Sequence, residues 1–129
     1  MFLTNIDKIL VNEVAPRPHN SGHYSIEASY TSQFEQHLRA ILGFPLGNTE
    51  NKTAAVMVNL VGDADHTGDV IYKNIERILE MDGVTPHIYG KKITKPFRKM
   101  GHVTIINKDI VKAREIAALV KKTIKVISK

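Results

Sequence analysis

The sequence predicts a domain of the α+β class. It contains short apolar and β-branched runs typical of strands, stretches with helical periodicity and capping residues, and loops rich in proline, glycine and asparagine. The 129 residues are about one domain's worth of chain, and no apolar run approaches the roughly 20 residues of a membrane span. The start of the chain lacks the features of a signal peptide and there are no cysteines, so we expect a cytoplasmic protein without membrane contact.

The first two elements are expected to be strands. Residues 2–4 and 8–14 are joined by a turn at residues 5–8, and Pro16 ends the second strand. The segment Asn12 to His23 follows and contains a carboxylate, an arginine, two histidines and an asparagine. Its prolines and glycine argue against a helix, so we expect a loop at the end of a strand, where ligand-binding residues collect.

A helix is expected over residues 32–43. Ser32 and Glu35 form a capping-box pattern, and Gly43 ends the helix. Its apolar face consists of Phe34, Leu38, Ile41 and Leu42. The helix therefore completes a first substructure made of two strands, a polar loop and one helix.

A boundary between two substructures is expected in the loop of residues 44–53, which is rich in proline, glycine and asparagine. We therefore divide the chain into residues 1–47 and 54–129. The second part opens with a mostly apolar, β-branched run at residues 54–61, closed by Gly62, which predicts a buried strand.

The rest of the second part is predicted to contain two helices and two further strands. One helix runs from about Asp69 to Gly83, the strands cover residues 87–89 and 102–106, and the last helix begins after the capping residue Asp109. The first helix aligns Ile71, Ile75, Ile78 and Leu79. The last helix carries a stripe of Ala113, Ala117, Val120, Ile124 and Ile127. Both stripes predict core packing.

Charge is unevenly distributed along the chain. Residues 91–129 hold 12 of the 18 Lys and Arg residues and only two acids, a net charge of +10, whereas residues 1–90 have a net charge of −5. Such asymmetry indicates a partner that carries phosphate, either nucleic acid or a phosphorylated small molecule. The alternative is a solvated helix face followed by a basic tail.

Three separated motifs carry a resemblance to a known family. They are NEVAPRPHNSGH at residues 12–23, TSQFEQHLRA at residues 31–40 and RKMGH at residues 98–102. In this order they resemble carboxyaminoimidazole ribonucleotide synthetase, an ATP-grasp ligase of purine biosynthesis. The resemblance spans nearly the whole chain but only about the C-terminal third of such an enzyme.

The resemblance implies the end of an ATP-grasp domain, with its strands, ligand loop and helix, followed by a small C-terminal β-sheet subdomain with two helices. In the family a further magnesium-binding glutamate lies just before the position of Phe2. We therefore expect a truncated reading frame or one half of a split enzyme, catalytically silent alone. The family is commonly dimeric, which leaves a homodimer open.

The implied chemistry is activation of bicarbonate by ATP to carboxyphosphate, followed by carboxylation of aminoimidazole ribonucleotide. By resemblance, Glu13 binds Mg²⁺ between the ATP phosphates, a role suited to a hard oxygen ligand. Arg17 offers a planar fork of donors that matches bicarbonate or carboxyphosphate. His19 and Asn20 complete the anion pocket or orient the amine. Without the resemblance, the sequence favours a surface ion pair for Arg17 and a hydrogen bond to the loop backbone for His19.

The second predicted site is the basic loop that precedes His102. By resemblance, Lys95, Arg98 and Lys99 bind the phosphate of aminoimidazole ribonucleotide. Pro96 stiffens this loop, and Gly101 permits a close backbone approach. A solvated basic loop is the alternative.

A function of a different class is a small basic nucleic-acid-binding or partner-supporting module without catalysis. The sequence gives little support for nucleic-acid binding. Only two aromatic residues, Tyr89 and Phe97, lie near the cations in the sequence, there is no Trp, and the chain contains no recognisable RNA-binding motif. We therefore expect ATP, bicarbonate and aminoimidazole ribonucleotide as partners, and no nucleic acid.

Overall fold

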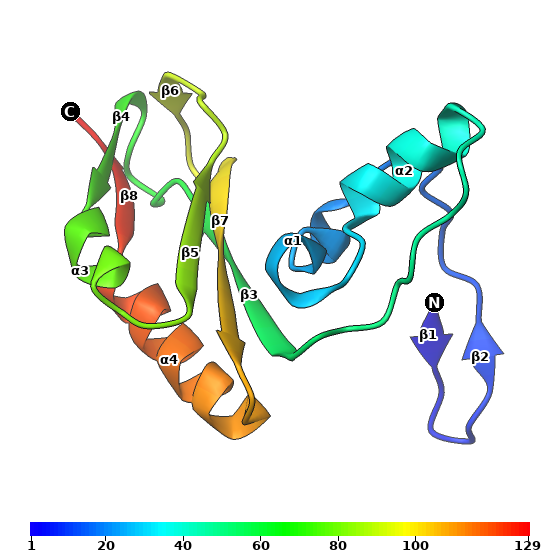
Figure 1. Cartoon of the computed structure of the whole chain (residues 1–129). Helices are drawn as coiled ribbons and strands as arrows, with labels where there is room; N and C mark the ends of the chain where they lie inside the picture. The colour runs from blue at the N-terminus through cyan, green and yellow to red at the C-terminus, as the bar shows by residue number, and fades with distance from the viewer.

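The computed structural model describes all of residues 1–129, and two groups of elements follow one another along the chain (Figure 1). The first group comprises β1 (Phe2–Leu3), β2 (Ile9–Leu10), the 3₁₀ helix η1 (Asn20–Gly22), α1 (Ser25–Ala28) and α2 (Gln33–Ile41). The second group comprises β3 (Ala54–Val61), β4 (Gly68–Lys73), α3 (Ile75–Leu79), β5 (Val84–Ile88), β6 (Ile93–Thr94), β7 (Lys99–Asn107), α4 (Ile110–Thr123) and β8 (Lys125–Ser128). The α+β class is confirmed.

Every strand pair within the named sheets is antiparallel. β1 and β2 form a hairpin, β3, β7 and β5 form a sheet in the order β3-β7-β5, and a second sheet has the order β6-β4-β8. The long strand β7 is central, with Ile105 opposite Val56 on one side and Val84 on the other. This strand therefore connects the hydrophobic core to the basic loop at its beginning.

The core lies between the β3-β7-β5 sheet and helices α3 and α4. Ile78, Val103 and Ile105 are fully buried. Of the stripe predicted on the last helix, Ala113, Ala117 and Val120 are buried on α4, as expected. Helix α4 lies against β3 and β7 (Figure 1). No helix in the structure is both long and apolar enough to cross a bilayer.

The predicted helix from Asp69 is wrong over its first half. Residues 68–73 form strand β4, in which exposed and partly buried residues alternate, and the helix α3 is limited to Ile75–Leu79. Val70 and Tyr72 point toward the core while Ile71 is 40% exposed, so the real period is two residues. Pairing of β4 with β8 overrides the weak helical periodicity.

The last helix is also shorter than predicted. It ends at Thr123, and Ile127 lies instead in strand β8, directly opposite Ile71 of β4. The β-branched residues that follow Thr123 favour a strand once β4 offers a partner. Ile124, at the end of the helix, is buried as expected.

Three smaller predictions need correction. The second strand covers only Ile9–Leu10 of the predicted residues 8–14, because its partner β1 has two residues. The loop of residues 12–23 does contain one helical turn, at Asn20–Gly22. In the strand of residues 54–61 only Leu60 is fully buried, because β3 is an edge strand that pairs with β7 alone.

Candidate active site

The polar loop of residues 12–23 leaves β2 and ends in the single turn η1. His19 is the N-cap of this turn: its Nδ1 accepts a hydrogen bond from the backbone N–H of Ser21 at 3.3 Å and lies 2.9 Å from the Ser21 hydroxyl. The imidazole is therefore held by its own loop, and the loop ends in a defined conformation.

Gln33, the first residue of α2, fixes the backbone of this loop. Its Nε2 donates to the His19 carbonyl at 2.7 Å, and its Oε1 accepts from the His19 N–H at 2.9 Å. Nε2 also lies 2.6 Å from Nδ1 of His23. Gly22 leaves room for this amide, because a Cβ at residue 22 would collide with it. Sequence reasoning missed Gln33, although it lies within the second of the three motifs.

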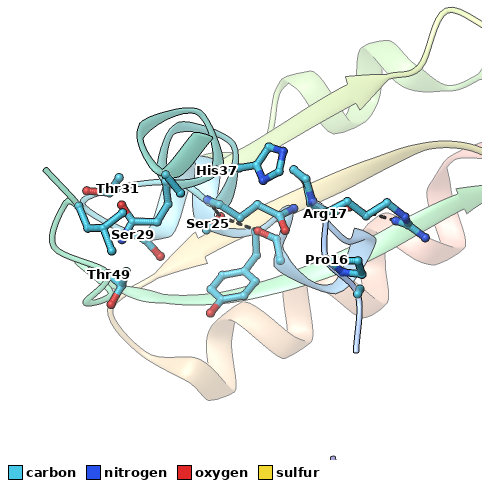
Figure 2. Close-up of a pocket in the computed structure, with 15 residues that line it drawn as sticks. Pro16, Arg17, Ser25, Ser29, Thr31, His37 and Thr49 are labelled. Carbon is cyan, nitrogen blue, oxygen red and sulfur yellow. Dashed lines mark hydrogen bonds between the residues drawn. The ribbon is translucent and has the colours of Figure 1, made fainter. Parts of the chain in front are cut away.

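Arg17 borders the largest cavity of the chain. This cavity of about 540 Å³ lies between the loop, α1, α2 and the segment around Thr49. Figure 2 shows Pro16 and Arg17 at one end, Ser29, Thr31 and Thr49 at the other, and Ser25 and His37 between them. The Arg17 guanidinium is exposed and donates only to the neighbouring Pro18 carbonyl, at 3.1 Å. Most of its donors are therefore free for an anion.

Glu13 and His19 share a second, smaller hollow of about 230 Å³ that also includes Asn12, Ala15 and Ser21. The Glu13 carboxylate is exposed, and nowhere in the chain do three or more His, Asp or Glu side chains gather in a way that could hold a metal. Mg²⁺ is commonly bound by one or two carboxylates together with phosphate oxygens and water. Glu13 can therefore contribute one ligand to such a site but does not complete it.

Asn20 and Lys99 are brought together although 79 residues separate them. The Lys99 ammonium donates to Oδ1 of Asn20 at 3.0 Å, and Nδ2 of Asn20 donates to the Tyr89 hydroxyl at 3.3 Å. Two predicted site residues from different motifs thus meet where the loop touches the start of β7.

The side chains of the other two cations of the predicted phosphate site make no hydrogen bond to Asn20 or Lys99. Arg98 is exposed and donates to the Ile93 carbonyl at 2.9 Å, and Lys95 is exposed with no side-chain hydrogen bond. Lys91, which sequence reasoning did not select for the phosphate site, contacts the backbone of Lys99. Its ammonium donates to the Lys99 carbonyl at 2.7 Å and lies 5.7 Å from the centre of the Tyr89 ring. Only the pairing of β5 with β7 reveals this proximity.

Gly101 permits the close approach that the sequence predicts. The carbonyl oxygen of His87 on β5 occupies the space that a Cβ would need. One residue on, His87 and His102 are cross-strand partners whose rings stack at 4.5 Å. The His23 ring lies 5.0 Å from that of His102, so a histidine from the loop completes a cluster with two from the sheet.

Burial favours the neutral form of two imidazoles of the histidine cluster, those of His102 and His23. His102 is 2% exposed; burial, then the neighbouring His87 and His23, lowers its pKa to about 4, against the opposing effect of Glu27. Burial is also the main cause that lowers the pKa of His23. Nε2 of His87 lies within hydrogen-bond distance, 2.7 Å, of the Glu27 carboxylate. The cluster therefore joins α1, the loop and the sheet.

Because of this cluster, we expect the folded chain to become less stable as the pH falls. Between pH 6.5 and about 4, His102 takes up a proton in the unfolded chain but not in the folded one. The free energy of unfolding should therefore decrease as the pH falls through this window, by up to about 1.4 kcal/mol per pH unit for one histidine. Urea unfolding at pH 7, 6 and 5 measures the slope. His102→Gln should flatten it, whereas His37→Gln, outside the cluster, should leave it unchanged; equal slopes in all three proteins would contradict the assignment.

Comparisons with known proteins agree with this arrangement. Two family profiles match: phosphoribosylaminoimidazole carboxylase C-terminal domain over residues 55–116, and ATP-grasp domain over residues 1–34. The crystal structure of N5-carboxyaminoimidazole ribonucleotide synthetase from Thermotoga maritima is 54% identical and covers 100% of this chain with a TM-score of 0.96. The chain corresponds to the C-terminal portion of this synthetase family. The resemblance carried by the three motifs is confirmed.

Relatives of the synthetase family are considerably longer than this chain. Phosphoribosylaminoimidazole carboxylase of Schizosaccharomyces pombe is 54% identical over 106 residues, and N5-carboxyaminoimidazole ribonucleotide synthase of Bacillus subtilis is 48% identical over 106 residues. The match covers 78% and 82% of this chain, respectively, but only 19% and 26% of the two relatives. It covers 36% of the Thermotoga maritima chain. The matched region is the end of the ATP-grasp domain together with the family's C-terminal domain.

Proposed function

We propose that this chain supplies one wall of the active site of an ATP-dependent ligase of purine biosynthesis, which carboxylates aminoimidazole ribonucleotide with bicarbonate through carboxyphosphate. The observation that carries the proposal is the meeting of the loop containing Arg17, His19 and Asn20 with Lys99 of β7. A related synthase from Aspergillus clavatus, solved with ADP and aminoimidazole ribonucleotide, supports it at 35% identity and a TM-score of 0.81.

Arg17 is proposed to hold bicarbonate and then carboxyphosphate. Its guanidinium is exposed at the edge of a cavity and has most of its donors free. A planar fork matches two oxygens of such an anion and stabilises the charge that develops on transfer. His19 and Asn20 are proposed to complete the pocket or to orient the amine, since both belong to the turn that follows Arg17.

Glu13 is proposed to hold Mg²⁺ together with the phosphate oxygens of ATP. The metal would neutralise phosphate charge during phosphoryl transfer. The single exposed carboxylate of Glu13 fits a metal that takes most of its ligands from phosphate and water.

The phosphate of aminoimidazole ribonucleotide is proposed to bind the basic loop through Lys95, Arg98 and Lys99. Lys91 joins this set, because its ammonium reaches the Lys99 carbonyl. Cations around one loop suit a compact dianion, and they lie on the part of the chain with the net charge of +10.

The β1–β2 hairpin supports the view that further protein completes the site. Phe2, Leu3, Ile9 and Leu10 are each 51–71% exposed, although all four are large apolar residues. An apolar hairpin with two open edges is a surface on which another segment packs. We infer that the upstream part of the ligase covers it, and a second copy of the chain is the alternative occupant. A cytoplasmic location stays a prediction.

The decisive experiment measures ADP release that depends on bicarbonate and aminoimidazole ribonucleotide. The chain is assayed alone, mixed with the separately expressed upstream part of the Thermotoga maritima synthetase, and fused to that part as a chimera. Activity in the mixture or the chimera, but not in the chain alone, is the expected result. A folded chimera without activity would overturn the proposal, and salt-sensitive binding to an arbitrary oligonucleotide would favour a nucleic-acid-binding module instead.

Arg98→Ala should mainly weaken ribonucleotide binding in the chimera. The guanidinium is exposed and makes only one hydrogen bond, to the Ile93 carbonyl. Its loss therefore removes a hydrogen-bond donor to the substrate phosphate without disturbing the core. We expect the KM for aminoimidazole ribonucleotide to rise about tenfold with little change in kcat or in the KM for ATP. Arg114→Ala, on the exposed face of α4, is the control. An unchanged KM would move the phosphate site away from Arg98.

A further inference from the structure

The Asn20 amide is held in one orientation by two neighbours of opposite hydrogen-bonding character. Lys99 carries only donors, so the atom of Asn20 that faces it at 3.0 Å has to be the oxygen Oδ1. The amide nitrogen Nδ2 then faces the Tyr89 hydroxyl at 3.3 Å, which has to accept. A flipped amide would place two donors face to face at Lys99.

The Tyr89 hydroxyl can accept from Asn20 because its own proton has another acceptor. Nδ1 of His102 lies 3.0 Å from the hydroxyl oxygen. Burial, reinforced by His87, holds the pKa of His102 near 4, and burial raises the pKa of Tyr89, so the imidazole is neutral and the phenol protonated at pH 7. The arrangement that uses both groups has the Tyr89 hydroxyl donating to Nδ1, with the single N–H proton of the neutral imidazole on the buried Nε2.

The His102 ring is fixed by the sheet itself. It lies on β7 directly opposite His87, stacked against that ring at 4.5 Å, and its Nε2 is buried without a hydrogen-bond partner. A buried polar atom left unpaired is costly, so on its Nε2 side this ring is held by packing and not by a hydrogen bond. Nδ1 is consequently aimed at one place only, the Tyr89 hydroxyl.

We propose that Tyr89 and His102 are positioning residues for the active site: His102 orients the Tyr89 hydroxyl, and Tyr89 orients the Asn20 amide toward Lys99. Neither residue needs to touch the substrate. We call this chain of hydrogen bonds, from His102 through Tyr89 to Asn20 and Lys99, the relay. It leaves one N–H and one oxygen lone pair of Asn20, and two N–H groups of Lys99, available to a ligand. It rests on the proposed function in so far as Asn20 and Lys99 bind substrate, but the geometry of the amide is testable without substrate.

The kinetic test uses Tyr89→Phe in the chimera with the Thermotoga maritima upstream part. This change removes one oxygen atom and keeps the ring. Tyr72→Phe is the matched control, because Tyr72 is also half-buried and donates to a backbone carbonyl, that of Met100, at 3.0 Å. We expect kcat/KM for aminoimidazole ribonucleotide to fall about five- to tenfold in Tyr89→Phe and less than twofold in Tyr72→Phe.

A double-mutant cycle separates positioning from a merely structural role. If Tyr89 acts through Asn20, Tyr89→Phe should cost less than twofold when Asn20 is already Ala. The same five- to tenfold loss in both backgrounds would overturn the proposal, as would a loss equal to that of Tyr72→Phe.

A second readout needs no activity. In the nitrogen-15-labelled 129-residue chain, the side-chain amide signals of Asn20 should shift and broaden in Tyr89→Phe but not in Tyr72→Phe. Unchanged Asn20 signals would overturn the positioning role. An inactive unsubstituted chimera would instead overturn the proposed function and leave this amide measurement decisive for the relay.

Discussion

Arg17→Ala is expected to reduce turnover of the chimeric ligase by about two to three orders of magnitude. This is the loss seen when one preorganised donor to a developing anion is removed from an acyl-transfer site, and the guanidinium offers several donors. The KM for ATP should change little, because the proposed partner of Arg17 is bicarbonate or carboxyphosphate. Steady-state ADP release at saturating ATP measures the effect.

Folding should be unaffected by this substitution. Arg17 is exposed, and its only side-chain bond goes to the adjacent Pro18 carbonyl. Arg77→Ala, at an exposed position of α3, is the matched control and should retain full activity. Arg17→Lys keeps the charge but loses the planar fork, so we expect an intermediate loss. Near-normal turnover in Arg17→Ala would refute the proposed role.

Ile105→Ala is expected to have the largest effect on stability, a loss of about 2–5 kcal/mol in the free energy of unfolding. Ile105 is 0% exposed at the centre of β7, between Val56 and Val84 of the flanking strands. Removing three carbon atoms there leaves a cavity that a sheet covered by α3 and α4 closes only in part. Urea unfolding of the 129-residue chain gives the value.

A graded series makes the core prediction specific. Ile105→Val removes one methylene group and should cost about 0.5–1.5 kcal/mol. Leu119→Ala, on the outer face of α4 where the side chain is 51% exposed, should change the free energy of unfolding by about 0.5 kcal/mol or less. Equal losses at Ile105 and Leu119 would show that the core does not lie where the structure puts it.

The elements predicted well are those with strong local signals. The cap at Ser32, whose hydroxyl accepts from the Glu35 N–H, begins α2 as expected, and Asp109 caps α4. The prediction failed at residues 69–73 and at Ile127, where β4 pairs with β8 at the end of the second part. Such pairing depends on a partner about 55 residues away and leaves no local periodic signal.

The candidate site, too, was predicted from the sequence only in part. Glu13, Arg17, His19 and Asn20 follow from one contiguous motif, and the sequence also supplied the family and the basic character of residues 91–129. Their roles stay predictions, as does the division at residues 1–47 and 54–129. The clamp of Gln33 on His19 was not predicted, because an amide at a helix start has no distinctive pattern.

By itself the sequence determined the α+β class, the family, the polar loop and the excess of positive charge, because each of these depends on residue types and short spacings. Only the tertiary structure decided that Asn20 meets Lys99, that the Lys91 ammonium bonds the Lys99 carbonyl, and that His102 is a buried neutral imidazole behind Tyr89. The physical reason is that antiparallel pairing of β5 with β7 sets which side chains face one another, and burial then sets their protonation.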